Sequence, residues 1–336
     1  MKFEEPAFAW LNGAVVPFDQ CVVHGRSQGA FWGANVFEGL RGYWRPADQR
    51  LHVFRLQEHL ARLRRSMKSV RMEVPWSDKE ITEACLDVLR ANEFTEDVHM
   101  CVVAYFGMGP NLDPLSHTDD TGMHITATRM PRSGGYHTGV AAAISSWRRI
   151  SDDSMPPRIK TGANYHNSRL AQHEAVRNGY DTTLLLNQRG NVAEAPGSCV
   201  VMVRDGRLVT PPGSSGVLEG ITLDTVLQLA GELGLPVERR EVDRTELYVA
   251  DETFLCGTLA EIQPVVSIDR LPVGTGEPGP VTRRLQRRYE LAVHAEPAYA
   301  GRGWTTPVDD PHPQPGVPEP AHSTPAMAGV GGGCVI

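Results

Sequence analysis

A short proline- and glycine-rich break divides this chain into two halves. It runs Pro131-Arg132-Ser133-Gly134-Gly135-Tyr136, a composition typical of a linker between domains. The chain has 336 residues, and single hydrophobic cores stop growing at roughly 250–300 residues. We therefore expect a small N-terminal α/β domain over residues 1–130, a linker over 131–138, and a larger domain over 139–305.

Residue patterns in the first half predict a sheet with helices packed against it. A hairpin is expected around Asn12-Gly13, because this dipeptide favours a tight turn. The strands are predicted over 8–11, 14–18, 36–43, 51–54, 98–106 and 122–129. Apolar residues recur at helical spacing over 56–70, and a second helix is expected over 78–92 after the cap-like Ser77.

Strands and helices alternate in the second half, so the fold class is expected to be α+β or α/β. Helices are predicted over 167–178, 223–233 and 281–292. Strands are predicted over 140–147, 182–186, 198–204, 207–210, 237–242, 252–256 and 259–268. From residue 306 to 336 the chain is rich in proline and glycine, which cannot bury a core, and we expect a disordered tail.

Composition excludes several classes of function. The net charge is -7 with both signs dispersed, which gives no reason to expect nucleic acid or an anionic membrane as a partner. No apolar run approaches the ~20 residues that cross a bilayer. The six cysteines are far apart and form no Cys-x-x-Cys pair, which indicates free thiols in a reducing cytoplasm and no metal site.

Lys160 has the context of a functional residue. Taken alone, a lysine is expected on the solvated surface. Lys160, however, is followed at intervals by Glu194, by Gly220-Ile221-Thr222 directly before a predicted helix, and by Gly257-Thr258 at the end of a predicted strand. Each has an ordinary explanation as a loop residue, a cap or a turn, but these four features together with Arg62 do not arise easily by chance in this order.

Together these residues suit pyridoxal phosphate chemistry. Lys160 supplies an amine that can form an imine and shuttle a proton. Glu194 supplies a carboxylate for the pyridine nitrogen. Backbone amides at the start of the helix after Gly220 can bind a phosphate, and the guanidinium of Arg62 can complete that cradle.

The chain resembles the fold-type IV (class IV) aminotransferases, and most of all the branched-chain amino acid aminotransferases. The resemblance covers nearly all of residues 5–305. It is carried by stretches such as Val36-Phe37-Glu38-Gly39-Leu40-Arg41, Ile159-Lys160-Thr161-Gly162-Ala163-Asn164-Tyr165 and Leu218-Glu219-Gly220-Ile221-Thr222.

The resemblance implies a two-domain fold with the cofactor between the domains, and a homodimer whose subunits complete each other's pockets. It implies that Lys160 is catalytic, binds pyridoxal 5'-phosphate and moves a proton at the substrate. Glu194 is expected on the pyridine nitrogen and Tyr165 on the ring oxygen. The expected phosphate ligands are Arg62, Gly220, Ile221, Thr222, Gly257 and Thr258. The expected substrate-side residues are Trp32, Phe37, Gly39, His99, Cys101, Tyr136 and Leu259.

Departures from the family pattern concern the substrate side. His99 and Cys101 stand where branched-chain enzymes have a Tyr-x-Arg pair that seats glutamate, and Leu259 replaces a small residue. Residues 195–199 also differ from the usual Gly-x-Gly-Glu-Asn. The resemblance therefore predicts transamination between a 2-keto acid and an amino acid with a largely uncharged side chain.

Two other functions stay open at this point. One keeps the cofactor but changes the reaction: a lyase similar to aminodeoxychorismate lyase, or a D-amino-acid or amine transaminase. Phe37 and Gly39 fit the branched-chain pattern better. The other is a protein that binds the cofactor without turnover, as a regulator or partner subunit. The presence of both Lys160 and Glu194 argues against that reading, because an inactive protein need not keep both.

Overall fold

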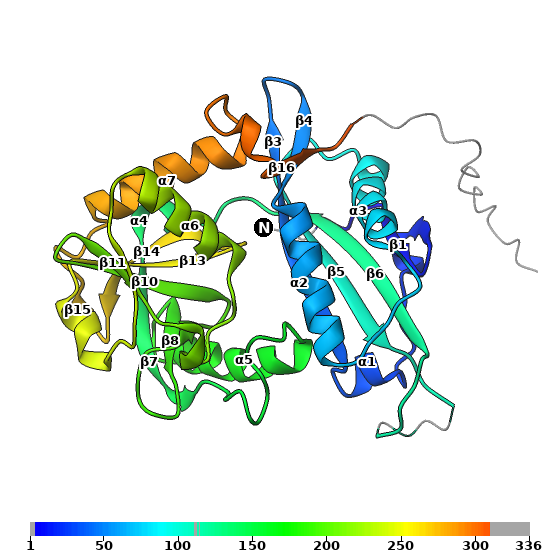
Figure 1. The fold of residues 1–336 in the computed structure, drawn as a ribbon, viewed down its shortest axis with the longest axis horizontal. Helices are drawn as coiled ribbons and strands as arrows, with labels where there is room; N and C mark the ends of the chain where they lie inside the picture. Colours follow the sequence, from blue (N-terminus) through cyan, green and yellow to red (C-terminus); the bar gives the residue numbers. More distant parts are fainter. Residues whose placement is uncertain (1–3, 111–112, 114, 310–336) are drawn as a thin grey trace, which may run out of the picture.

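The computed structural model describes residues 4–110, 113 and 115–309, and the strands of this part form two sheets (Figure 1). The first, of seven strands, has the order β16-β4-β3-β5-β6-β1-β2. Its members are β1 (Phe8–Leu11), β2 (Ala14–Pro17), β3 (Asn35–Arg45), β4 (Arg50–Phe54), β5 (Val98–Phe106), β6 (Thr121–Arg129) and β16 (Thr305–Pro307). All neighbouring pairs in this sheet are antiparallel.

The second sheet, of nine strands in the same described part, mixes parallel and antiparallel pairs. Its main order is β12-β11-β10-β13-β14-β7-β8, with β15 paired to β14 and β9 to β10. Its members are β7 (Val140–Arg148), β8 (Thr182–Leu186), β9 (Glu194–Ala195), β10 (Ser198–Arg204), β11 (Arg207–Thr210), β12 (Val237–Arg239), β13 (Glu252–Gly257), β14 (Glu261–Ile268) and β15 (Leu271–Pro272). The expected mixed α and β class is confirmed.

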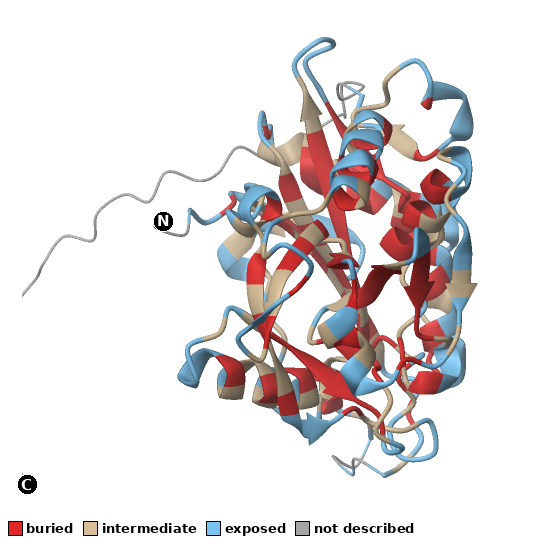
Figure 2. Cartoon of the chain, turned by 90° about the vertical axis from the view of Figure 1, so that its left-hand side faces the viewer, coloured by how far each residue is buried: buried red, intermediate tan, exposed pale blue. Residues whose placement is uncertain are grey.

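Helices cover these sheets. The α-helices are α1 (Gln28–Phe31), α2 (Leu56–Ser69), α3 (Asp78–Asn92), α4 (Gly135–Thr138), α5 (Gly162–Arg177), α6 (Ile221–Glu232) and α7 (Pro280–Val293). Short 3-10 helices span Phe18–Gln20, Gly213–Ser215, Arg244–Val249 and Ala300–Arg302. Figure 2 shows that buried residues concentrate in the strands and on the helix faces that meet them.

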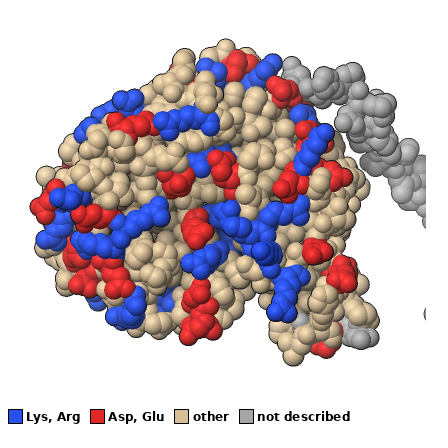
Figure 3. Space-filling view, in the orientation of Figure 1, with Lys and Arg blue, Asp and Glu red and all other residues tan. Residues whose placement is uncertain are grey.

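Local sequence explains several of these elements. The β1–β2 turn places Asn12 and Gly13 at positive φ, which this pair tolerates. The helix α3 begins at a capping box in which Ser77 and Glu80 satisfy each other's backbone amides. The helix α2 turns Leu56, Leu60 and Leu63 into the core of the first sheet. Its opposite face exposes Arg65 and Lys68, and Lys and Arg side chains gather along this helix in Figure 3.

Three boundary predictions are wrong in ways that matter for the site. Helix α5 begins at Gly162 instead of residue 167, because the Asn35 side chain accepts the Gly162 N–H at 3.0 Å and satisfies the start of the helix. Tyr165 therefore lies in the first turns of α5. Helix α6 begins at Ile221 instead of residue 223, so Ile221 and Thr222 form its first turn. Strand β14 begins at Glu261 instead of residue 259, because Glu261 takes a positive φ of 51° in the turn from β13.

Other differences concern connections. The predicted linker contains the short helix α4. The strand predicted over 237–242 ends at Arg239, because the Val242 carbonyl accepts the Val192 N–H instead. The tail predicted to be disordered from residue 306 begins as β16, which pairs with β4 after the buried Trp304. The rest of that predicted tail, residues 310–336, lies outside the described residues.

Buried polar groups make some of the contacts between the two sheets. Tyr43 of β3 donates to Glu261 at 2.9 Å, and Arg132 donates to the same carboxylate at 2.6 and 3.1 Å. Glu261 thus joins the first sheet, the predicted linker and the second sheet.

No helix of the described chain is long and apolar enough to cross a bilayer.

Candidate functional site

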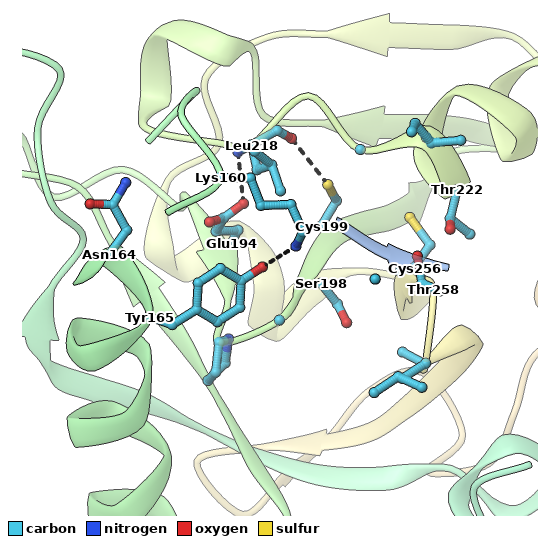
Figure 4. A pocket seen from close by; sticks show the side chains of 18 of the residues that line it. Lys160, Asn164, Tyr165, Glu194, Ser198, Cys199, Leu218, Thr222, Cys256 and Thr258 are labelled. Carbon is cyan, nitrogen blue, oxygen red and sulfur yellow. Dashed lines mark hydrogen bonds between the residues drawn. The ribbon is translucent and has the colours of Figure 1, made fainter. Parts of the chain in front are cut away.

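A cavity of about 430 Å³ lies between the two sheets and is lined from both sides (Figure 4). The first sheet contributes Phe37 and Gly39 of β3 and His99 of β5, and α2 contributes Arg62. The second half of the chain supplies most of the remaining lining, including Lys160, Tyr165 and Glu194 and the turns around residues 220 and 257. Residues that are distant in sequence therefore meet in one space.

Lys160 is held inside this cavity. Its side chain precedes α5, and the residue is only 9% exposed. The Nζ atom donates to the Tyr165 hydroxyl at 2.6 Å and lies 4.5 Å from the centre of the Phe37 ring. The backbone is fixed as well, because the Lys160 carbonyl accepts the Phe37 N–H at 2.9 Å. An amine fixed in this way can react with a bound molecule while its neighbours exclude bulk water.

Glu194 presents a buried carboxylate to the same cavity. One of its oxygens accepts the Leu218 N–H at 2.9 Å, and the other lies 2.7 Å from a guanidinium nitrogen of Arg149. Burial raises the pKa of the Glu194 carboxyl, and the Arg149 charge opposes that rise. Sequence reasoning missed Arg149. The only signal was an arginine pair, Arg148-Arg149, at the end of a predicted strand.

Two glycine turns form a cradle suited to a phosphate. Gly220 is the N-cap of α6 and makes no side-chain cap hydrogen bond, so no cap side chain accepts the first backbone amides of the helix. Gly220, Ile221 and Thr222 line the cavity, where these amides can bind an anion. A Cβ atom at Gly220 would lie 2.8 Å from the Cys199 sulfur, and one at Gly257 would lie 2.9 Å from the Gly197 carbonyl oxygen. Glycine is therefore required for both close approaches. Thr222 and Thr258 also line the cavity.

Arg62 reaches the cavity through a buried ion pair. It makes two 2.7 Å hydrogen bonds to Glu38 and donates at 2.7 Å to the carbonyl of Glu219, next to Gly220. Glu38 also contacts His59 Nδ1 at 2.7 Å. Burial alone would raise the pKa of Glu38, but Arg62 and His59 lower it to about 2. Sequence reasoning missed Glu38 and His59 as partners that orient Arg62 toward the glycine cradle.

The imidazole of His99, which lines the cavity, brings no fixed charge to it. A Cβ atom at Gly39 would lie 2.8 Å from His99 Nε2, so the imidazole lies over this glycine. Burial, together with the charges of Lys160 and Arg41, lowers the pKa of His99 to about 4. At neutral pH the ring is therefore neutral. Leu259, which is partly exposed, adds an apolar side chain to this lining.

Three residues predicted to contact substrate lie outside the cavity lining of this chain. Trp32 is 57% exposed at the end of α1. Tyr136 is buried under Arg132, whose guanidinium carbon lies 4.4 Å from its ring centre. Cys101 sits beside His99, with its sulfur 3.8 Å from Nδ1. The other predicted site residues all line the cavity.

Comparison with known proteins identifies relatives along most of the chain. A model of the family described as amino-transferase class IV matches residues 35–268. A probable branched-chain-amino-acid aminotransferase of Aquifex aeolicus is 38% identical over 307 residues, which are 90% of this chain and 97% of that protein. The branched-chain-amino-acid aminotransferase of Salmonella typhimurium is 37% identical over 317 residues, covering 92% of this chain and 100% of that protein.

Solved structures show the same similarity. The branched-chain amino acid aminotransferase of Thermobaculum terrenum in its PLP form superposes with a TM-score of 0.84 and 45% identity, covering 91% of this chain and 99% of that chain. The Escherichia coli enzyme superposes with a TM-score of 0.86 and 35% identity, covering 91% of this chain and 100% of that chain.

Proposed function

Since the chain belongs to the class IV aminotransferases, which use pyridoxal 5'-phosphate, we propose that it exchanges amino groups between amino acids with uncharged, branched-chain-like side chains and 2-keto acids. The observation that carries the proposal is the meeting of Lys160, Glu194 and the glycine cradle in one cavity. The relatives agree with the family expected from the sequence. They do not favour a lyase, a D-amino-acid or amine transaminase, or a protein without turnover.

The donor set fits the cofactor. Pyridoxal phosphate supplies an aldehyde that captures an amine and a protonated ring that withdraws electrons. We assign the aldehyde to the Lys160 amine, the ring oxygen to Tyr165 and the ring nitrogen to the Glu194 carboxylate. The phosphate would be held by the first amides of α6 at Ile221 and Thr222, by the turn at Gly257-Thr258 and by Arg62.

Each of these residues has a distinct part in the reaction. The Nζ atom of Lys160 would take the proton from the α-carbon of the amino acid and hold it for return to the product. The Tyr165 hydroxyl, 2.6 Å away, keeps that amine within reach when it is released. Glu194 stabilises a proton on the neighbouring ring nitrogen. The Phe37 ring, packed 5.0 Å from the Tyr165 ring, limits the access of water to the amine.

Charges in the cavity favour an uncharged side chain. Arg62 is paired with Glu38, Arg149 with Glu194, and His99 is neutral at physiological pH. A second substrate carboxylate would therefore lack a free cation among these groups and would lose hydration without compensation. The relatives described above, which are named as branched-chain aminotransferases, support the same substrate class.

We also propose that the enzyme is a cytoplasmic homodimer. The exposed rings of Phe31 and Trp32 in and after α1 support this assembly, because a second copy would cover them. Trp32 would then contact the pocket of the neighbouring subunit. The six separated cysteines support a reducing compartment.

A screen of amino donors against 2-keto acceptors tests the proposed function. Purified protein loaded with pyridoxal phosphate is incubated with each donor and acceptor, and both new amino acid and new keto acid are quantified. We expect equimolar formation of the two products with leucine, valine or isoleucine as donor, and none with Lys160→Ala. Consumption of a donor without an equivalent amount of new amino acid would contradict transamination, and no product from any pair would overturn the proposal.

A further inference from the structure

Arg149 is a buried cation that no part of the reaction described above uses directly. It follows the last residue of β7 and is only 4% exposed. Its guanidinium contacts three separate parts of the second half of the chain. One nitrogen lies 2.7 Å from Glu194, Nε donates to the Gly216 carbonyl at 3.3 Å, and another donates to the Ser168 hydroxyl at 3.5 Å. Such a fork cannot rotate away from Glu194 without losing its other partners.

The Glu194 carboxylate is correspondingly held on both oxygens. The Arg149 guanidinium lies at one oxygen, and the Leu218 amide donates to the other at 2.9 Å. A buried carboxylate tends to take up a proton, because the low-dielectric interior disfavours its charge. Burial accordingly raises the pKa of Glu194, and the Arg149 charge is the main influence in the opposite direction.

We infer that Arg149 is a positioning residue that keeps Glu194 ionised and directed at the ring nitrogen of the bound cofactor. The inference rests on the proposed function, because that function places the ring nitrogen against Glu194. By stabilising the carboxylate charge, Arg149 would favour a proton on the ring nitrogen over a proton on the Glu194 carboxyl.

Neither of the other cations near Glu194 can replace this contribution. The guanidinium of Arg62 is bound bidentately by Glu38, and the amine of Lys160 is held by Tyr165. Both groups lower the pKa of Glu194 less than Arg149 does. Arg148, the preceding residue, is exposed and offers a matched control at nearly the same place in the chain.

The test is a double-mutant cycle measured on cofactor binding. Arg149→Met is made in the wild-type and the Glu194→Gln backgrounds, with Arg148→Met as control. The dissociation constant for pyridoxal phosphate and the pH titration of its absorbance are recorded for each protein, together with the melting temperature without cofactor. In the wild-type background we expect Arg149→Met to weaken binding about 10- to 100-fold and to shift the absorbance titration, as for loss of a charged hydrogen bond.

The energetic coupling between Arg149 and Glu194 decides whether Arg149 acts through Glu194. In the Glu194→Gln background, Arg149→Met is expected to weaken cofactor binding by less than about threefold, because there is no carboxylate charge left to stabilise. Arg149→Lys, which keeps the charge, is expected to restore the wild-type titration, and it keeps the inference testable if Arg149→Met does not fold. Equal losses in both backgrounds, or an unchanged titration in Arg149→Met and Arg149→Lys alike, would overturn the inference. A wild-type protein that binds the cofactor but transfers no amino group would instead contradict the proposed function.

Discussion

The Nζ atom of Lys160 lies 2.6 Å from the hydroxyl oxygen of Tyr165, five residues further along the chain. This distance follows from the start of α5 at Gly162, which brings Tyr165 round to the side of the lysine within about one turn. The Phe37 ring lies on another side of the same amine, 4.5 Å from Nζ. These two contacts fix the position of the amine in the cavity.

Removing the Tyr165 hydroxyl should slow transamination. We expect Tyr165→Phe to reduce the single-turnover rate with L-leucine by about 10-fold, because the hydrogen bond between the hydroxyl and the Lys160 amine is lost while the ring remains. Rapid-mixing absorbance measurements check this. Tyr180→Phe, at a tyrosine outside the cavity lining, should keep the wild-type rate. A wild-type rate in Tyr165→Phe would show that the hydroxyl does not position the lysine.

Neutralising Glu194 should separate binding from catalysis. Glu194→Gln keeps the shape of the side chain but loses the charge that stabilises a proton on the ring nitrogen. We expect the variant to bind the cofactor and to transaminate ~100-fold more slowly or worse, as for a charged hydrogen bond worth about 3 kcal/mol. Glu241→Gln, at a half-exposed surface ion pair, serves as control. Near-normal turnover in Glu194→Gln would show that catalysis does not depend on the charge of Glu194.

Stability at acid pH should depend on Glu38. Its pKa is held at about 2 in the folded protein, below its ordinary 4.5, by Arg62 and His59 against the effect of burial. A lowered carboxyl pKa stabilises the fold above pH ~4.5, and this stabilisation is lost as the pH falls toward ~2. The shift corresponds to a free energy of unfolding on the order of 3 kcal/mol.

Urea unfolding between pH 7 and pH 3 measures this contribution. Wild type should lose more unfolding free energy over that range than Glu38→Gln, which is less stable at pH 7 but has no carboxylate to protonate. His59 also has a lowered pKa, mainly through burial, so its protonation on acidification adds a loss in the same direction. Parallel curves for the two proteins would contradict the assigned pKa of Glu38.

The sequence predicted the groups that carry chemistry better than their partners. Lys160, Glu194 and the turns at residues 220 and 257 could be found because their order along the chain matches a family pattern. Arg149 could not, because its contact with Glu194 joins the end of β7 to the short strand β9, 45 residues later, and leaves no local pattern. The contact between Glu38 and Arg62 could not be predicted either, because it joins β3 to α2 and depends on tertiary packing.

The predicted helix and strand boundaries were wrong where tertiary contacts, and not local sequence, determine where an element begins or ends. The start of α5 depends on the side chain of Asn35, more than 100 residues earlier, which accepts the Gly162 N–H. The short strand β16 forms because β4 offers a free edge, and its own sequence, Thr-Thr-Pro, does not predict a strand. Trp32, predicted on the substrate side, is exposed and lies outside the cavity lining of this chain.

The neutral His99 predicts a preference among amino donors. With cofactor-loaded protein, the single-turnover half reaction should be about 30-fold or more faster with L-leucine than with L-glutamate, because the arginines that line the cavity, Arg62 and Arg149, are already paired with carboxylates. His99→Arg should raise the glutamate rate relative to leucine, whereas His99→Gln should leave the ratio nearly unchanged. Glutamate reacting as fast as leucine in wild type would show that another cation, such as Arg41 or Arg132, reaches the substrate.

The central claim, amino transfer through a cofactor bound to Lys160, can be tested most directly by trapping that bond. The chain has four lysines, and of these Lys68 and Lys79 are exposed whereas Lys160 is buried. The cofactor-loaded protein is reduced with borohydride, digested and mapped by mass spectrometry, with and without prior incubation with excess L-leucine. We predict a phosphopyridoxyl adduct on Lys160 that disappears after leucine, because transamination releases the cofactor from the lysine. An adduct on Lys2, Lys68 or Lys79, or one on Lys160 that leucine leaves unchanged, would contradict the account.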